Sequence, residues 1–237
     1  MTQLFISNHI LNWDRIEINN INIIKKIKNV LRAGSWYKFY LQDYFVSWDD
    51  FTLTRYLVEV ESLEKSNLIW LVKDKESFNI NYSNTWILVP LLNSFDKIEL
   101  IVQKLSELWI ENIVFWKSRY SQINTINDKK IERFNKIALE AVQQSKWYYV
   151  PKIFYTNSLS DFIKDKKIIS FNFNWENYKR LNLPKSNLFW IIWPEWWLSQ
   201  EDLKIIDWSI ENTISLWNNI LRAETAAIIW WRIIINA

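Results

Sequence analysis

The sequence predicts an α/β protein with a mostly parallel sheet, preceded by a smaller β-rich domain. Short apolar runs alternate with amphipathic helical patterns from residue 86 onward, which favours a parallel sheet with helices between its strands. Before residue 75, short β-prone runs follow one another between turn signals. We therefore expect a β-rich domain over residues 1–75 and an α/β domain over residues 76–237.

The β-rich domain is predicted from four short runs and one helix. A pattern of apolar residues at helical spacing, with lysines between them, predicts the helix over residues 20–32. The polar stretch Lys73–Thr85 is expected to be the linker between the domains. The predicted strands are Leu4–Ile6, Tyr37–Leu41, Phe51–Val60 and Leu68–Val72.

The α/β domain shows clear signals at its helix ends. Ser94 and Ser199 stand where N-cap residues belong, and Trp109 stands at the C′ position, where glycine is usual. The predicted strands are 87–92, 112–115, 167–171, 188–192 and 212–216, and the predicted helices are 94–108, 129–146, 157–164, 200–207 and 222–235.

Composition excludes several classes of site. The chain has no Cys and one His, His9, which argues against thiolate metal sites, a cysteine nucleophile and a Ser-His-Asp triad, and we expect no metal. No apolar run reaches the roughly 18 residues of a membrane span, and no signal-peptide pattern is visible at the N-terminus. We expect a cytoplasmic protein with no membrane partner. The net charge of +3 permits nucleic-acid binding without requiring it.

Tryptophan occupies positions that call for glycine. The chain has 17 Trp and one Gly, so reading each Trp as Gly would give 18 glycines in 237 residues, close to the usual share of about 7%. Trp13, Trp48 and Trp175 lie in turn contexts between Asn, Ser, Asp or Glu. We hypothesise that UGA codons of this gene encode glycine. The alternative is a protein that is truly rich in tryptophan.

Two stretches carry a resemblance to a known family. With glycine in place of tryptophan, residues 192–199 would read Ile-Gly-Pro-Glu-Gly-Gly-Leu-Ser, and residues 216–226 would read Leu-Gly-Asn-Asn-Ile-Leu-Arg-Ala-Glu-Thr-Ala. Together with the helix motif of Lys97, Glu99, Gln103, Lys104 and Glu107, they resemble the RsmE-type 16S rRNA (uracil-N3) methyltransferases of the SPOUT class.

The resemblance implies a fold and a cofactor. It implies an N-terminal PUA-like β-barrel that binds RNA, followed by a SPOUT α/β domain with a C-terminal trefoil knot. S-adenosylmethionine would bind in the knot, held largely by backbone groups. The residues carried over to that cofactor site are Ile192, Trp193, Pro194, Glu195, Leu216, Trp217, Asn218, Ile220 and Leu221.

The implied reaction transfers a methyl group to N3 of a uridine in 16S rRNA. That nitrogen carries a proton, so catalysis should remove it and stabilise negative charge on the uracil oxygens. Arg222 is the candidate for stabilising the charge, and Glu195 and Glu224 are candidates for the base or for orienting Arg222. Thr225 could form a hydrogen bond in the same site. Glu224 could instead serve only the dipole of its helix.

RNA contacts are expected from cationic residues in both domains. The candidates are Lys28 and Arg32, with Lys25 and Lys26, in the first domain, and Arg119 in a loop of the second. Each could also be an ordinary surface residue. The expected partners are the small ribosomal subunit and a second copy of this chain, since sites in this class are usually completed by the partner subunit.

Some residues depart from the family pattern. Asn219 and Trp147 stand where the family has arginine, and Lys146 stands where it has glycine. Two alternatives therefore stay open: a non-catalytic SPOUT RNA-binding protein, and an enzyme with another target, such as a tRNA 2′-O-methyltransferase.

The glycine hypothesis predicts the mass of a peptide. In the natural protein, the peptide across residues 190–197 should contain glycine at positions 190, 193, 196 and 197. Peptide mass spectrometry of the protein from its own host measures this directly. Tryptophan in that peptide would refute the hypothesis.

Overall fold

The computed structural model describes residues 3–7, 10–12, 14–31, 37–42, 52–63, 68–80, 83–171, 187–193, 198–207, 210–214 and 221–235. Contacts divide the chain into two compact units. The first comprises Met1–Asn81 with Val142–Tyr149, and the second comprises Tyr82–Ala141 with Val150–Ala237. The predicted boundary after residue 75 falls within strand β6 (Leu68–Asn79).

The first unit is built on a six-stranded sheet in the order β1-β4-β5-β6-β3-β2. Strands β1 and β4 are parallel, and the other pairs are antiparallel. The register of the long β5–β6 hairpin shifts at two places, which bends the strands. The strands besides β6 are β1 (Gln3–Ile6), β2 (Ile10–Asn12), β3 (Arg15–Ile18), β4 (Lys38–Gln42) and β5 (Thr52–Leu63).

A helical segment near the N-terminus packs on the core of this sheet. Helix α1 (Ile21–Lys25) begins at Asn20, whose side chain accepts from two backbone N–H groups, and it continues as a π-helical turn, η1 (Lys26–Val30). Ile27 packs with Phe5, Phe39 and Trp70 in a fully buried cluster. The predicted helix and the four predicted strands of this unit are confirmed.

For the first unit, the predicted linker is partly wrong and the predicted barrel stays open. The linker expected over Lys73–Thr85 is wrong for residues 73–79, which extend β6. These residues are mostly polar and exposed, which is why the sequence predicted a linker. Their backbone nevertheless pairs with β5 and forms part of a hairpin. Strands β2 and β3 were not predicted. Closure of the sheet into a PUA-like barrel stays a prediction.

Arg55 of β5 fastens the segment 142–149 to the first-unit sheet. Its guanidinium donates to the carbonyl oxygens of Lys146 at 3.1 Å and Trp147 at 3.4 Å, and to the side chain of Gln42 at 2.9 Å. It also lies 5.2 Å from the ring centre of Tyr148. Burial lowers the pKa of Arg55, although a guanidinium remains charged at neutral pH.

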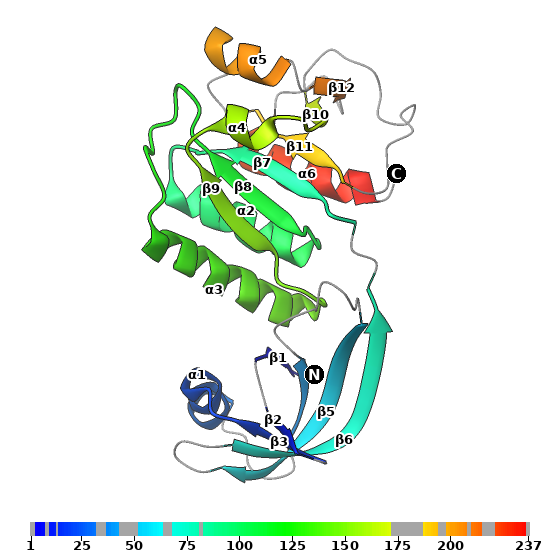
Figure 1. Ribbon diagram of the computed structural model, residues 1–237. Helices are drawn as coiled ribbons and strands as arrows, with labels where there is room; N and C mark the ends of the chain where they lie inside the picture. The colour runs from blue at the N-terminus through cyan, green and yellow to red at the C-terminus, as the bar shows by residue number, and fades with distance from the viewer. Residues whose placement is uncertain are drawn as a thin grey trace. The chain divides into compact units, whose positions relative to one another are not determined.

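The second unit is built on a six-stranded parallel sheet in the order β12-β10-β11-β7-β8-β9. Helices connect most of its strands, so the predicted α/β class is confirmed (Figure 1). The strands are β7 (Trp86–Pro90), β8 (Asn112–Trp116), β9 (Lys152–Thr156), β10 (Ile168–Phe171), β11 (Phe189–Ile191) and β12 (Ile210–Ile214). The helices are α2 (Phe95–Glu107), α3 (Asp128–Ser145), α4 (Leu159–Ile163), α5 (Gln200–Asp207) and α6 (Ala223–Ile235).

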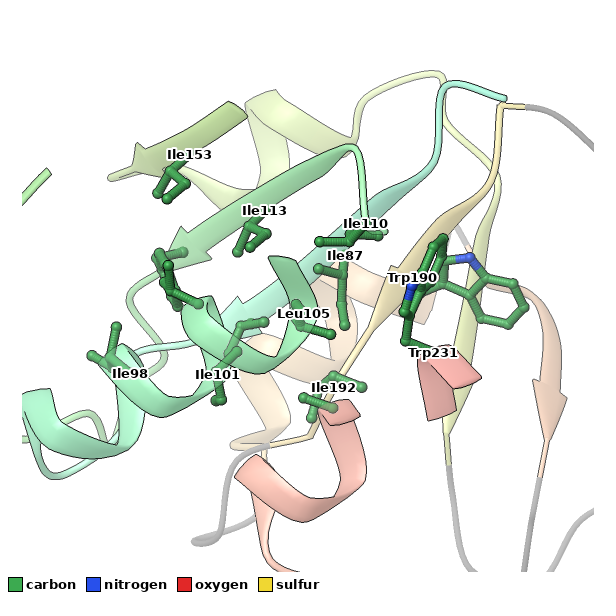
Figure 2. Packing of buried hydrophobic residues seen from close by; sticks show 14 of the residues in the cluster. Ile87, Ile98, Ile101, Leu105, Ile110, Ile113, Ile153, Trp190, Ile192 and Trp231 are labelled. Atoms are coloured by element: carbon green, nitrogen blue, oxygen red, sulfur yellow. The ribbon is translucent and has the colours of Figure 1, made fainter. Parts of the chain in front are cut away.

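Alternate side chains of the strands enter two cores, one on each face of this sheet. Ile87 and Ile113 pack against α2, α3 and α6, where Figure 2 shows Ile101, Leu105 and Trp231. Leu88 and Val114 point the other way and pack against α4 and α5. Because both faces are covered, the strands read as continuous apolar runs, which is why the sequence predicted most of them. Strand β9 was not predicted: it lies at the edge of the sheet with Lys152 and Phe154 exposed, so it is not a continuous buried run.

Glu111 fixes the start of β7. The residue is 3% exposed. Its carboxylate accepts from the backbone N–H groups of Ser83 at 2.8 Å and Thr85 at 2.6 Å, and from both of their hydroxyls. Asn112 adds a bond to the carbonyl oxygen of Thr85 at 3.0 Å. The chain therefore enters the parallel sheet in one defined position.

The end of α2 has the backbone geometry of a glycine cap. Trp109 has φ 75° and is 37% exposed. The N–H of Ile110 donates to the carbonyl oxygen of Leu105 at 3.2 Å, and the N–H of Trp109 donates to that of Ser106 at 3.5 Å. These two bonds are those of a Schellman motif, whose C′ position favours glycine. The predicted C′ position of Trp109 is confirmed, and so is its need for a left-handed residue.

Replacing Trp109 by glycine should therefore stabilise the printed chain. We expect Trp109→Gly to raise the free energy of unfolding by roughly 1 kcal/mol relative to Trp109→Ala, because only glycine adopts this φ without steric cost. Urea denaturation of the two variants measures the difference. Equal stability of the glycine and alanine variants would contradict the argument.

Candidate active site

The carboxyl ends of the second-unit strands meet at one edge of the sheet, because all six strands are parallel. The backbone continues to pair just beyond this edge. The N–H of Leu91 donates to the carbonyl oxygen of Trp116 at 2.8 Å, and the N–H of Ile192 donates to that of Leu88 at 3.0 Å. In open α/β sheets, ligands bind at such carboxyl ends.

Two predicted cofactor residues, Ile192 and Trp193, leave β11 at this edge. Ile192 is fully buried. The indole N–H of Trp193 donates to the hydroxyl of Ser170, the penultimate residue of β10, at 2.7 Å. Ser170 is fully buried, and nothing in its sequence context had singled it out. The structure thus brings the ends of β10 and β11 together at the predicted cofactor position.

Most of the other predicted cofactor residues lie outside the described residues. Leu221, which is half-buried, is described. The predicted cofactor residues outside the described part of the chain are Pro194, Glu195, Leu216, Trp217, Asn218 and Ile220. The predicted trefoil knot stays a prediction.

Arg222 directly precedes α6 and Glu224 lies in its first turn, and the two side chains differ in exposure. The carbonyl oxygen of Arg222 accepts the first helical bond, from Ala226 at 2.8 Å, and its side chain is exposed. Glu224 is buried, and its carboxylate lies 3.9 Å from the ammonium of Lys97 on α2. Its Oε2 atom finds no hydrogen-bond donor among the described residues. Arg222 is therefore free to contact a substrate, whereas Glu224 faces a neighbouring helix.

The loop that carries Arg119 is tied to the start of α5 by Asp202. The buried carboxylate of Asp202 accepts from the backbone N–H of Arg119 at 3.2 Å and from the hydroxyl of Ser199 at 2.9 Å. The N–H of Asp202 donates to Ser199 Oγ at 3.1 Å. Ser199 and Asp202 thus form a reciprocal capping box, and the predicted cap at Ser199 is confirmed. Asp202 was not among the predicted site residues, although the Ser-x-x-Asp spacing from Ser199 is typical of a capping box.

The predicted RNA-binding cations of the first unit differ in exposure. Lys25 is exposed on α1. The ammonium of Lys26 lies 5.6 Å from the ring centre of Phe5, and Lys28 is half-buried. Arg32 lies outside the described residues. Lys25 is accordingly the most accessible of the described three, and their role in RNA binding stays a prediction.

The carboxyl edge carries exposed cationic groups. Arg222 and Arg119 offer fixed positive charge, and Leu221 is half-buried. In the printed chain the indole of Trp193 occupies the space beside Ser170. In the part of the chain that the structure describes, no three His, Cys, Asp or Glu residues gather as metal ligands.

Removal of the Asp202 carboxylate should loosen both elements that it joins. We expect Asp202→Ala to lower the free energy of unfolding by about 1–3 kcal/mol, because buried N–H groups lose their acceptor. Asp202→Glu should retain most of the stability, since glutamate also completes a capping box. Urea denaturation measures the loss, and hydrogen exchange of residues 117–121 reports the loop. Asp207→Ala, exposed in the last turn of the same helix, is the control and should change little.

No described helix is both long enough and apolar enough to span a bilayer.

Comparison with known sequences gives relatives of one kind. The chain is 27% identical over 236 residues to Ribosomal RNA small subunit methyltransferase E of Rickettsia conorii, and the match spans 95% of this chain and 91% of the relative. The protein of that name from Bacillus subtilis is 27% identical, over 71% of this chain and 72% of its own length.

Solved structures share the fold over the whole chain. The methyltransferase Lpg2936 from Legionella pneumophila, solved with its cofactor, has a TM-score of 0.82 at 17% identity and covers 100% of this chain and 98% of its own. Ribosomal RNA small subunit methyltransferase E from Neisseria gonorrhoeae has a TM-score of 0.81 at 18% identity, with the same coverage. The family model for the RNA methyltransferase domain matches residues 81–235. The chain therefore belongs to the RNA methyltransferase domain family.

Proposed function

We propose that the protein transfers a methyl group from S-adenosylmethionine to N3 of a uridine in 16S rRNA of the small ribosomal subunit. The observation that carries the proposal is the carboxyl edge of the parallel sheet. The start of the predicted cofactor loop at Ile192, the exposed Arg222 and the Arg119 loop all follow strands that end there. The names of the sequence relatives support rRNA as the substrate.

S-adenosylmethionine fits the residues at this edge. Both solved structures described above hold it, according to their names. Here the half-buried Leu221 would contact its apolar parts, and the backbone of the loops that begin at residues 193 and 215 would supply hydrogen bonds. Glycine at position 193 would allow the backbone to approach the cofactor closely.

The bound cofactor supplies an electrophilic methyl group on a sulfonium. Uracil N3 forms the new N–C bond as the S–C bond breaks, and the N3 proton is released, so the products are N3-methyluridine and S-adenosylhomocysteine. Negative charge that develops on the uracil oxygens would be stabilised by the Arg222 guanidinium. Glu195 is proposed to accept the N3 proton. Glu224, paired with Lys97, would keep the first turn of α6 in place and so position Arg222.

The proposed setting follows from the substrate. A protein that modifies the small ribosomal subunit works in the cytoplasm, and the cationic residues Lys25, Lys28, Arg32 and Arg119 would contact RNA phosphates. We further propose a homodimer, in which the partner subunit completes each site.

A second candidate function rests on the departures from the family. Asn219 and Trp147 replace arginines, which would weaken an RNA contact or the stabilisation of the transition state. The protein would then bind RNA and cofactor without transfer. A methylated product on the ribose 2′-oxygen would instead indicate an enzyme with a different target.

The test of the proposal combines binding with product analysis. Titration calorimetry should detect binding of S-adenosylmethionine, and incubation with unmodified small subunits and labelled cofactor should place the label in N3-methyluridine, identified by nucleoside mass spectrometry. Cofactor binding without transfer would favour the non-catalytic alternative. Label in a 2′-O-methylated nucleoside would refute N3 specificity.

Arg222 should affect the chemical step more than cofactor binding. We expect Arg222→Ala to lower kcat by about 10²–10³-fold, because one charge-stabilising donor is lost, with the Kd of S-adenosylmethionine changed less than threefold. Arg222→Lys should recover only part of the activity, since lysine lacks the planar fork. Steady-state methylation at saturating substrates measures kcat, and single-turnover methylation isolates the chemical step. Arg133→Ala, whose partner is Glu99, is the surface control. A large rise in the cofactor Kd of the Arg222 variants would contradict the assigned role.

A further inference from the structure

The loop after β8 presents two large side chains to solvent at the carboxyl edge. Tyr120 is 55% exposed, and the side chain of Arg119 is 67% exposed. Lys117 is exposed beside them. Figure 1 shows this loop between β8 and α3. A half-exposed tyrosine contributes little to a core, so its role in folding is small.

Hydrogen bonds hold the backbone of this loop in place. Ser121 Oγ accepts from the N–H of Ser118 at 3.1 Å and donates to the carbonyl oxygen of Leu91 at 3.0 Å. The N–H of Ser121 donates to the carbonyl oxygen of Ser118 at 3.2 Å. Asp202 adds the bond to the N–H of Arg119 described above. The loop is therefore tied to the end of β7 on one side and to the start of α5 on the other.

A fixed backbone makes exposed side chains into a preorganised surface. Binding then orders two side chains and no main chain, so less entropy is lost. The ion pair of Arg119 with Glu201 is 3.9 Å long and exposed on both sides. Such a pair is weak, so Arg119 can exchange it for a phosphate.

An aromatic ring beside two cations suits unpaired RNA. Every base has a face that can stack on an aromatic ring, and this stacking needs an unstacked base. Arginine and lysine contact the adjacent phosphates. A duplex offers neither a free base face nor an open strand, and an acidic peptide would not use the tyrosine ring.

We propose that Tyr120 stacks on an unpaired base of the RNA substrate while Arg119 contacts its backbone. This inference rests on the proposed function and deepens it, because the loop ends at the same sheet edge as Ile192 and so lies toward the proposed methyl donor. Tyr120 is then a substrate-positioning residue. It selects single-stranded RNA near the target uridine.

The test uses the full chain and a fluorescein-labelled 12-nucleotide oligouridine, with a 12-base-pair RNA duplex as the second probe. Fluorescence anisotropy should show that Tyr120→Ala weakens oligouridine binding about tenfold, whereas Tyr120→Phe stays within about threefold of the wild type. Duplex binding should be unchanged. Phe154→Ala, which removes another partly exposed aromatic ring, is the matched control and should bind oligouridine normally.

Arg119 and Tyr120 should differ in their response to salt. Arg119→Ala should reduce the slope of log K against log salt by about 0.7, since one phosphate contact on a single strand is lost. Tyr120→Ala should leave that slope unchanged. In methylation assays, Tyr120→Ala should raise the KM for the small subunit and leave the cofactor Kd unaltered.

Several outcomes separate the inference from the proposed function. Unchanged oligouridine binding by Tyr120→Ala, a Phe variant as weak as the Ala variant, or no oligouridine binding by the wild type would each overturn the stacking role. If the wild type binds oligouridine through Tyr120 but transfers no methyl group, the proposed function fails and the stacking role stands.

Discussion

The parallel pairing of β11 with β7 on one side and β10 on the other is the constraint on which the second unit depends. It joins the first strand of the unit to a strand 103 residues later in the chain, since Phe189 pairs with Trp86. Glu111 fixes the entry of β7, so the register of β11 follows from a defined start. The loop that carries Arg119 is hydrogen-bonded to Leu91, which directly follows β7, so its position also depends on that strand. Strand pairing therefore brings residues that are distant in sequence to the same edge of the sheet.

The sequence was most informative where periodicity and end signals agreed. Helix α2 could be read from Ser94 at its start, its apolar spacing, and Trp109 at its end. The outer half of β6 was missed because mostly polar residues carry the backbone pairing there, and side-chain patterns do not report pairing. The Asp202 link to Arg119 joins residues 83 positions apart. No local pattern specifies such a contact; only the cap at Ser199, beside Asp202, was predicted.

Tryptophan behaves in two ways in this structure. Trp190 and Trp231 fill the core, yet Trp109 adopts a left-handed backbone that glycine favours. Among the described residues, the buried indole N–H groups of Trp70 and Trp116 find no acceptor. An unmet buried donor costs about 1–3 kcal/mol. The left-handed backbone at Trp109 is what glycine at that position would adopt, whereas the buried indoles fill core space; the glycine hypothesis stays a prediction.

The bonds from Arg55 to Lys146 and Trp147 span about ninety positions of the chain, and they make the first unit discontinuous. A gene shortened to residues 1–81 would encode Arg55 and Gln42 without the carbonyl oxygens that they bind. A gene beginning at residue 82 would carry the segment 142–149 without its partners. Recombination that exchanges the N-terminal stretch between relatives must keep both sets of residues compatible. The two stretches are therefore expected to be inherited together.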